Sequence, residues 1–243
     1  YIDIQKYSQP GFNNLKPSPM ETYSRHSFQK YCAKYNLEYQ RITEPKLAFK
    51  HPTWERFDLW VDRSWWEKYD QIMYVDSDVI ALPHAGNIFQ EYPEINQKLK
   101  TCYYPKFRGA TPDGAKYNQR VNPLADNYTG EQIMQRFVQP GVMMLNKVST
   151  EFMLPWVSKY KEVTDDRIDD GMFLNGCIVD SKVPLLDMQR MYNHKNNGEK
   201  FDYNKVNFLH CAGGKKHKRN VKIWSKLKDI FPDVEVDLSG LEV

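Results

Sequence analysis

The 243-residue sequence lacks the features that mark several classes of protein. It contains no run of about 18 apolar residues, so no membrane span is predicted. It has only 4 cysteines, none in a CxxC pair, which favours reduced thiols and a cytoplasmic location over a disulfide framework. The chain begins with Tyr1 rather than methionine, which leaves room for a preceding anchor or signal segment.

An excess of charge of one sign is also lacking. The 34 basic and 31 acidic residues give a net charge of +3, which argues against a nucleic-acid partner. Hydrophobic residues make up 41% of the chain and aromatic residues 14%, too many for a disordered protein. Alternating strand and helix patterns without repeats predict one α/β domain over residues 1–243, with a mixed, mostly parallel central sheet flanked by helices.

A buried strand of that sheet is predicted at residues 71–80, QIMYVDSDVI. Its apolar residues lack period-two alternation, which is typical of a strand buried on both faces. Asp76 and Asp78 lie at the predicted carboxyl end, where open α/β sheets bind ligands. Residues i and i+2 of a strand share a face, so both carboxylates can bind one Mg²⁺ or Mn²⁺. A pair of turn or helix-capping aspartates is the alternative.

A second group of candidate residues follows a short strand predicted at 207–209, in the sequence HCAGGKK. His210 can complete a metal site as it leaves the strand. The glycines allow a pyrophosphate to approach the backbone, and Lys216 can neutralise it. The alternatives are a structural histidine and a solvated or nucleic-acid-binding basic patch over residues 215–219.

Asp169 and Asp170, together with Asn175, form a third candidate group. The two carboxylates lie directly before a helix predicted at 171–177. The pattern alone favours capping of this helix, and the alternative is that one carboxylate acts as a base or nucleophile. Arg56 lies off the apolar stripe of an earlier helix, where it is either solvated or close to a phosphate. The stripe itself is predicted to pack in the core; it comprises Trp54, Phe57, Trp60 and Val61.

Other elements follow from the same patterns. The irregular stretch 101–137 is predicted to recognise an acceptor, because long loops in compact domains are usually functional or mobile. Further helices are predicted from residue 19 to about 35, at 149–163 and at 221–230, and further strands at 1–4, 38–42, 139–146 and 183–186.

Several segments, taken in order, resemble GT-A-fold glycosyltransferases of the glycogenin and bacterial lipopolysaccharide-galactosyltransferase group. The short form also resembles transferases of large algal viruses. The matching segments are WERF at 54–57, the DxD strand at 74–80, NIF at 87–89, QPGVMMLN at 139–146 (similar to FNAGVMLLN), DDGMFLN at 169–175 (similar to DQxxLN) and HCAGGKK at 210–216 (similar to HxxGxxKPW).

The resemblance implies a single GT-A (Rossmann-like) domain with Mn²⁺, or Mg²⁺, as cofactor. It would transfer a hexose or deoxyhexose from a UDP-sugar to a glycan or glycoprotein acceptor. Residues 1–100 would be mainly the nucleotide-binding half, 101–219 the acceptor and catalytic half, and 220–243 a C-terminal helix and tail.

The resemblance also implies a role for each matching residue. Asp76, Asp78 and His210 would bind the metal, and Asp76 would also contact the ribose. Asp169 and Asp170 would be catalytic, with Asp170 as the base. The other donor-binding residues would be Ile4, Tyr7, Arg56, Ser77, Gly213 and Lys216.

The sequence departs from the family pattern in places: His217 follows Lys216 where the family has Pro-Trp, and Gln139-Pro140 replace Phe-Asn. Asp170 stands where retaining members carry glutamine. A carboxylate there can deprotonate an acceptor hydroxyl, which slightly favours inversion, or act as a nucleophile in a retaining enzyme. The alternative functions are a nucleotidyltransferase and a non-enzymatic nucleic-acid-binding module that uses the patch 215–219.

Overall fold

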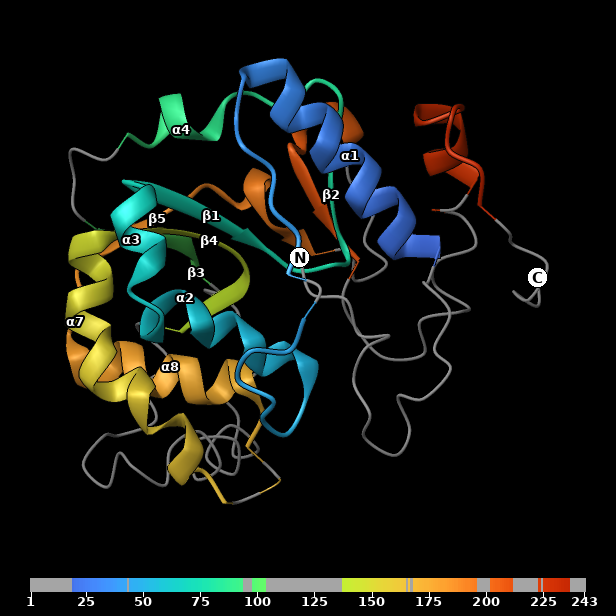
Figure 1. Cartoon of the computed structure of the whole chain (residues 1–243). Helices are drawn as coiled ribbons and strands as arrows, with labels where there is room; N and C mark the ends of the chain where they lie inside the picture. The colour runs from blue at the N-terminus through green and yellow to red at the C-terminus, as the bar shows by residue number, and fades with distance from the viewer. Residues whose placement is uncertain are drawn as a thin grey trace, which may run out of the picture. The chain divides into compact units, whose positions relative to one another are not determined.

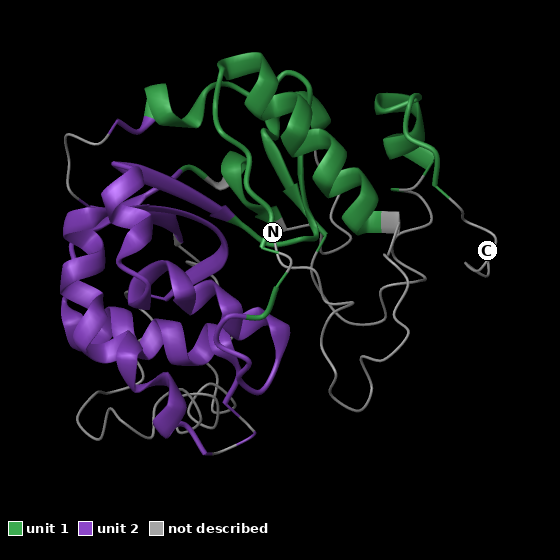
Figure 2. Ribbon diagram, in the orientation of Figure 1, with its two compact units in different colours: residues 1–45, 75–91, 189–243 green, residues 46–74, 92–188 purple. Residues whose placement is uncertain are grey.

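The protein is an α/β chain in which groups of helices and groups of strands follow one another (Figure 1). The computed structural model describes residues 19–42, 44–93, 98–103, 137–164, 166, 168–195, 202–211, 223 and 225–236. The chain divides into two compact units that interleave along the sequence (Figure 2). Unit 1 comprises residues 1–45, 75–91 and 189–243, and unit 2 comprises residues 46–74 and 92–188.

A 4-stranded sheet in the order β1-β4-β3-β5 lies almost entirely in unit 2. Its strands are β1 (Gln71–Val75), β4 (Val138–Asn146), β3 (Leu99–Tyr103) and β5 (Leu185–Asp187). The middle strand β3 pairs antiparallel with β4 and parallel with β5. The strand predicted at 139–146 is confirmed as β4, which is buried along nearly its whole length.

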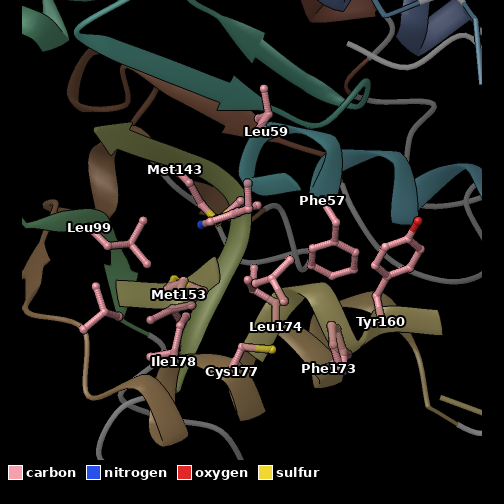
Figure 3. Close-up of a cluster of buried hydrophobic side chains, with 14 of the residues drawn as sticks. Phe57, Leu59, Leu99, Met143, Met153, Tyr160, Phe173, Leu174, Cys177 and Ile178 are labelled. Carbon is pink, nitrogen blue, oxygen red and sulfur yellow. The ribbon is translucent and has the colours of Figure 1, made fainter. Parts of the chain in front are cut away.

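Short helices pack against this sheet and close a core within unit 2 (Figure 3). The predicted aromatic stripe is confirmed, since Trp54, Phe57 and Trp60 are each at most 2% exposed. They meet Phe173 and other apolar side chains of α8 (Asp170–Ser181). The helical elements are η2 (Pro52–Phe57), α2 (Asp58–Val61), α3 (Ser64–Lys68), α7 (Lys147–Val157), η4 (Ser158–Glu162) and α8 (Asp170–Ser181).

Unit 1 contains a 3-stranded sheet in the order β2-β7-β6. Its strands are β2 (Val79–Ala81), β7 (Phe208–His210) and β6 (His194–Lys195), and its helical elements are α1 (Pro19–Tyr35), α4 (Ile88–Glu91), η5 (Arg190–Tyr192) and η6 (Tyr203–Lys205). Helix α1 lies against β2, where the Ser27 hydroxyl accepts the Ala81 N–H at 3.1 Å. Tyr23, Ile80 and Leu209 share a second core with Ile223, Leu227 and Phe231.

The prediction of a mostly parallel central sheet is wrong. The described strands form two mixed sheets, in which β3 pairs antiparallel with β4 and β2 pairs antiparallel with β7. The strand at 71–75, predicted to be buried on both faces, is β1; it lies at one end of the described sheet, and its first three residues are only half-buried. An apolar run therefore fixes neither the position of a strand in a sheet nor the direction of its pairing. The prediction of a strand at 38–42 is also wrong, because that segment forms only an isolated bridge at Ile42.

All 4 cysteines are free and buried, as the scattered spacing predicted. Cys32 and Cys211 belong to unit 1, and Cys102 and Cys177 belong to unit 2. Burial raises the pKa of the Cys32 thiol to about 11 and raises the thiol pKa of Cys177 and Cys211 further still. None of the helices in the described part of the chain combines the length and apolarity needed to cross a membrane.

Candidate metal site and carboxylate cluster

A tight turn carries the two aspartates of the DxD sequence. Strand β1 ends at Val75, and β2 begins at Val79, whose N–H donates to the Asp76 carbonyl at 3.1 Å. This bond closes a β-turn of residues 76–79. The prediction of one continuous strand over 71–80 is therefore wrong, and the turn, not the alternation of a strand, positions Asp76 and Asp78.

Strand β7 brings His210 to this turn. It pairs antiparallel with β2 in a register that places His210 opposite Val79. The ladder continues one step further, because the Cys211 N–H donates to the Asp78 carbonyl at 2.9 Å. The strand predicted to deliver His210 is confirmed, and its pairing fixes the histidine beside the two carboxylates.

The three side chains converge. His210 Nε2 lies 3.3 Å from Asp78 Oδ1 and 4.0 Å from Asp76 Oδ2. One candidate ligand atom from each residue lies within 4.8 Å of the others. The imidazole is buried and both carboxylates are half-buried, so a bound ion would be partly shielded from water.

The chemistry of this donor set fits a divalent cation. Two carboxylate oxygens offset the charge of the ion, and a neutral imidazole nitrogen adds a third ligand. Asp76, Asp78 and His210 would supply three ligands to Mn²⁺ or Mg²⁺, ions that bind mainly oxygen ligands. Among the residues that the structure describes, this is the one group of at least 3 histidine, cysteine or acidic side chains arranged for a metal ion.

Asn193 holds the far side of the imidazole and was missed by the sequence analysis. Its amide Oδ1 lies 2.8 Å from His210 Nδ1, and both residues are buried. The two residues are 17 positions apart, and no spacing in the sequence signals their contact.

A second polar cluster lies within unit 2, around Asp170 at the start of α8. The Thr53 hydroxyl donates to Asp170 Oδ1 at 2.7 Å, and the Arg56 guanidinium pairs with Oδ2 at 2.9 Å. Each carboxylate oxygen thus has its own partner. The contact between Thr53 and Asp170 joins residues 117 positions apart and is a finding of the structure.

Arg56 is internal to unit 2. Its side chain is 3% exposed, which excludes the solvated alternative. It donates to the carbonyls of Thr53 and Pro140 at 3.0 and 3.3 Å, and its guanidinium lies 5.0 Å from the centre of the Tyr74 ring. These contacts hold the positively charged guanidinium of Arg56 beside the Asp170 carboxylate.

Asp169 is the N-cap of α8, as the pattern favoured. Its backbone is extended, and its Oδ1 accepts the Met172 N–H at 2.7 Å. Although the residue is exposed overall, partial burial of the carboxyl raises its pKa, and the neighbouring Asp170 charge adds to the rise.

We expect Asp169→Ala to lower the free energy of unfolding by about 1 kcal/mol, because it removes the cap. Asp169→Asn keeps a capping oxygen and should match or exceed wild type near neutral pH. The raised pKa disfavours the ionised form in the folded protein, so wild type loses stability relative to Asp169→Asn as the pH rises from 3.8 through that pKa. Urea unfolding at acidic and neutral pH measures both effects, and equal losses in the two variants would contradict capping.

Other predicted residues have less structural context. Ser77 lies in the turn between the two aspartates. Several predictions lie outside the described residues: the strand at 1–4, Ile4 and Tyr7, most of the acceptor stretch 101–137, Gly213, Lys216 and the basic patch 215–219. The helix predicted at 221–230 is confirmed at residues 223 and 225–230.

Comparison with known proteins shows which solved structures have a similar fold. No family model and no curated protein matches this sequence. The structure is similar to a glycosyltransferase involved in the glycosylation of the major capsid of PBCV-1, with a TM-score of 0.54, 12% identity, and coverage of 87% of this chain and 96% of that one. It is also similar to the bifunctional glycosyltransferase WbbM in its apo form, with a TM-score of 0.55 and 11% identity over 85% of this chain.

These similarities define a glycosyltransferase-like α/β fold, which confirms the resemblance at the level of the fold. This chain spans only 41% of the WbbM chain, so WbbM contains a large part with no counterpart here. The fold together with the Asp76, Asp78 and His210 cluster is the basis for a functional assignment.

Proposed function

We propose that this protein is a metal-dependent glycosyltransferase that moves a hexose or deoxyhexose from a UDP-sugar to a glycan or glycoprotein acceptor. The observation that carries the proposal is the convergence of Asp76, Asp78 and His210 within a glycosyltransferase-like fold. A carboxylate-rich site for a divalent cation is suited to a substrate whose leaving group is a diphosphate.

Each ligand residue has a defined task in this proposal. Asp76, Asp78 and His210 hold Mn²⁺ or Mg²⁺, and Asp76 also contacts the ribose. The bound metal would supply Lewis-acid stabilisation of the negative charge on the departing UDP. The remaining proposed donor contacts come from Ile4, Tyr7, Arg56, Ser77, Gly213 and Lys216.

Asp170 is the proposed base, which accepts the proton of the acceptor hydroxyl in an inverting reaction. The Thr53 hydroxyl and the Arg56 guanidinium fix both of its oxygens, so the carboxylate is held in one orientation. Asp169, which was proposed with it as catalytic, contributes by capping α8 and thereby holding the backbone that carries Asp170.

Calorimetric titration of UDP and UDP-glucose, with and without Mn²⁺, tests the proposal. Wild type should bind either ligand tightly only in the presence of the metal. Asp78→Asn should weaken this binding about 100-fold or more. Losing a side chain that binds the metal directly should cost more than losing one that only orients such a side chain, which costs about 10- to 100-fold. Asp229→Asn removes an exposed carboxylate elsewhere in unit 1 and should bind like wild type.

Folded wild type that binds neither ligand in the presence of Mn²⁺ would overturn the proposal. Binding of a nucleoside triphosphate with release of pyrophosphate would instead identify a nucleotidyltransferase. Affinity for nucleic acid that falls steeply with salt and is indifferent to Asp78→Asn would identify a binding module.

A further inference from the structure

We infer that Asn193 is a positioning residue that fixes the tautomer of His210 and thereby sets the metal affinity of the site. The inference rests on the proposed function, in that it takes the cluster of Asp76, Asp78 and His210 to bind a divalent cation. Asn193 acts through the imidazole, whose Nδ1 lies 2.8 Å from its amide oxygen.

The chemistry follows from which atoms face each other. The amide Oδ1 of Asn193 can only accept a hydrogen bond, so the proton of the neutral imidazole resides on His210 Nδ1. The Nε2 lone pair then points to the side of the ring where Asp76 and Asp78 lie. A metal-ligating histidine needs this arrangement, in which the other ring nitrogen donates to a fixed acceptor.

The backbone on both sides of Asn193 is tied to the strand that carries His210. Before it, the Met191 carbonyl accepts the Asn207 N–H at 2.8 Å. After it, β6 begins at His194, which pairs with Leu209 of β7. Strand β7 therefore fixes both the ligand and the residue that orients it.

Burial makes the contact necessary. Asn193 is 0% exposed and His210 is 5% exposed, so water has little access to replace the amide oxygen. A substitution that removes this acceptor leaves a buried N–H without its partner or shifts the proton to Nε2. In the second case the proton occupies the nitrogen that must bind the metal.

The test is the Mn²⁺ affinity of the full chain, measured by electron paramagnetic resonance without any nucleotide. Asn193→Leu, which is similar in size but has no acceptor, should weaken binding about 10- to 100-fold. Asn193→Asp retains the acceptor and should bind as tightly as wild type or more tightly. Asp229→Asn serves as the matched control that should match wild type.

The tautomer can be read independently of the metal. Nitrogen-15 NMR of the metal-free protein, with His210 assigned by comparison with His210→Ala, should show a protonated Nδ1 in wild type and in Asn193→Asp. Thermal unfolding shows whether Asn193→Leu folds. If it does not fold, the NMR measurement on wild type still shows which ring nitrogen of His210 carries the proton. A protonated Nε2 in neutral wild-type His210 would overturn the inference.

The outcomes separate this inference from the proposed function. Wild type that binds no Mn²⁺ would overturn the metal site and the proposed function together. Wild type that binds Mn²⁺ with folded Asn193→Leu at the same affinity would overturn only the role of Asn193. Equal weakening in Asn193→Asp and Asn193→Leu would also overturn it, because an acceptor alone would then be insufficient.

Discussion

Replacing Asp170 with asparagine is expected to slow sugar transfer about 10²- to 10⁴-fold, the range typical for loss of a general base. The amide oxygen can still accept the Thr53 hydroxyl, but it cannot take a proton from an acceptor. Binding of UDP in the presence of Mn²⁺ should be unchanged, since Asp170 does not belong to the metal cluster. Release of UDP from a UDP-sugar in the presence of a glycan acceptor measures the rate.

The matched control for this variant is Glu162→Gln, which neutralises an exposed carboxylate of unit 2 and should transfer sugar at the wild-type rate. The anomeric configuration of the product, read by proton NMR, should be inverted relative to the donor. A wild-type rate in Asp170→Asn would exclude Asp170 as the base. A retained configuration would favour its role as a nucleophile.

The largest expected effect on stability is that of Arg56→Met, which should lower the free energy of unfolding by about 3–5 kcal/mol. The substitution leaves the Asp170 carboxylate, whose side chain is 13% exposed, without its cation. It also removes the donors to Thr53 and Pro140. Urea unfolding measures the loss.

Two further variants show whether the buried pair is the cause. Arg56→Met combined with Asp170→Asn should recover part of the loss, because no uncompensated charge remains. The exposed pair of Arg63 and Glu151 is the control, and Arg63→Met should cost only about 0–1 kcal/mol. If both arginine variants lost the same small amount, the Arg56 pair would be no stronger than a surface contact.

Much of the fold was predictable because the signals were local. The apolar run of β4, the aromatic stripe of η2 and the strand that delivers His210 are all written in short stretches of sequence. The direction of pairing was not, because burial on both faces looks the same in parallel and antiparallel strands. The antiparallel pairing of β3 with β4 depends on residues far apart in the chain.

In the candidate site, too, the residues with local sequence signals were predictable and those that depend on distant contacts were not. Asp76, Asp78 and His210 were identified from residue type and context, although a turn and not a strand brings the aspartates together. Asn193 and Thr53 could not be found, because each acts through one contact with a residue distant in sequence. Asparagine and threonine are too common near helix starts and turns to signal such a contact.

The four buried cysteines make the opening of each unit measurable by chemistry. A thiol reacts with alkylating reagents as the thiolate, and the buried thiols with raised pKa hold little of that form in the folded protein. Modification must therefore proceed through transient opening, so its rate reports the free energy of that opening. Cys32 and Cys211 report on unit 1, and Cys102 and Cys177 report on unit 2. Cys211, directly after His210, records the fluctuations closest to the candidate metal site.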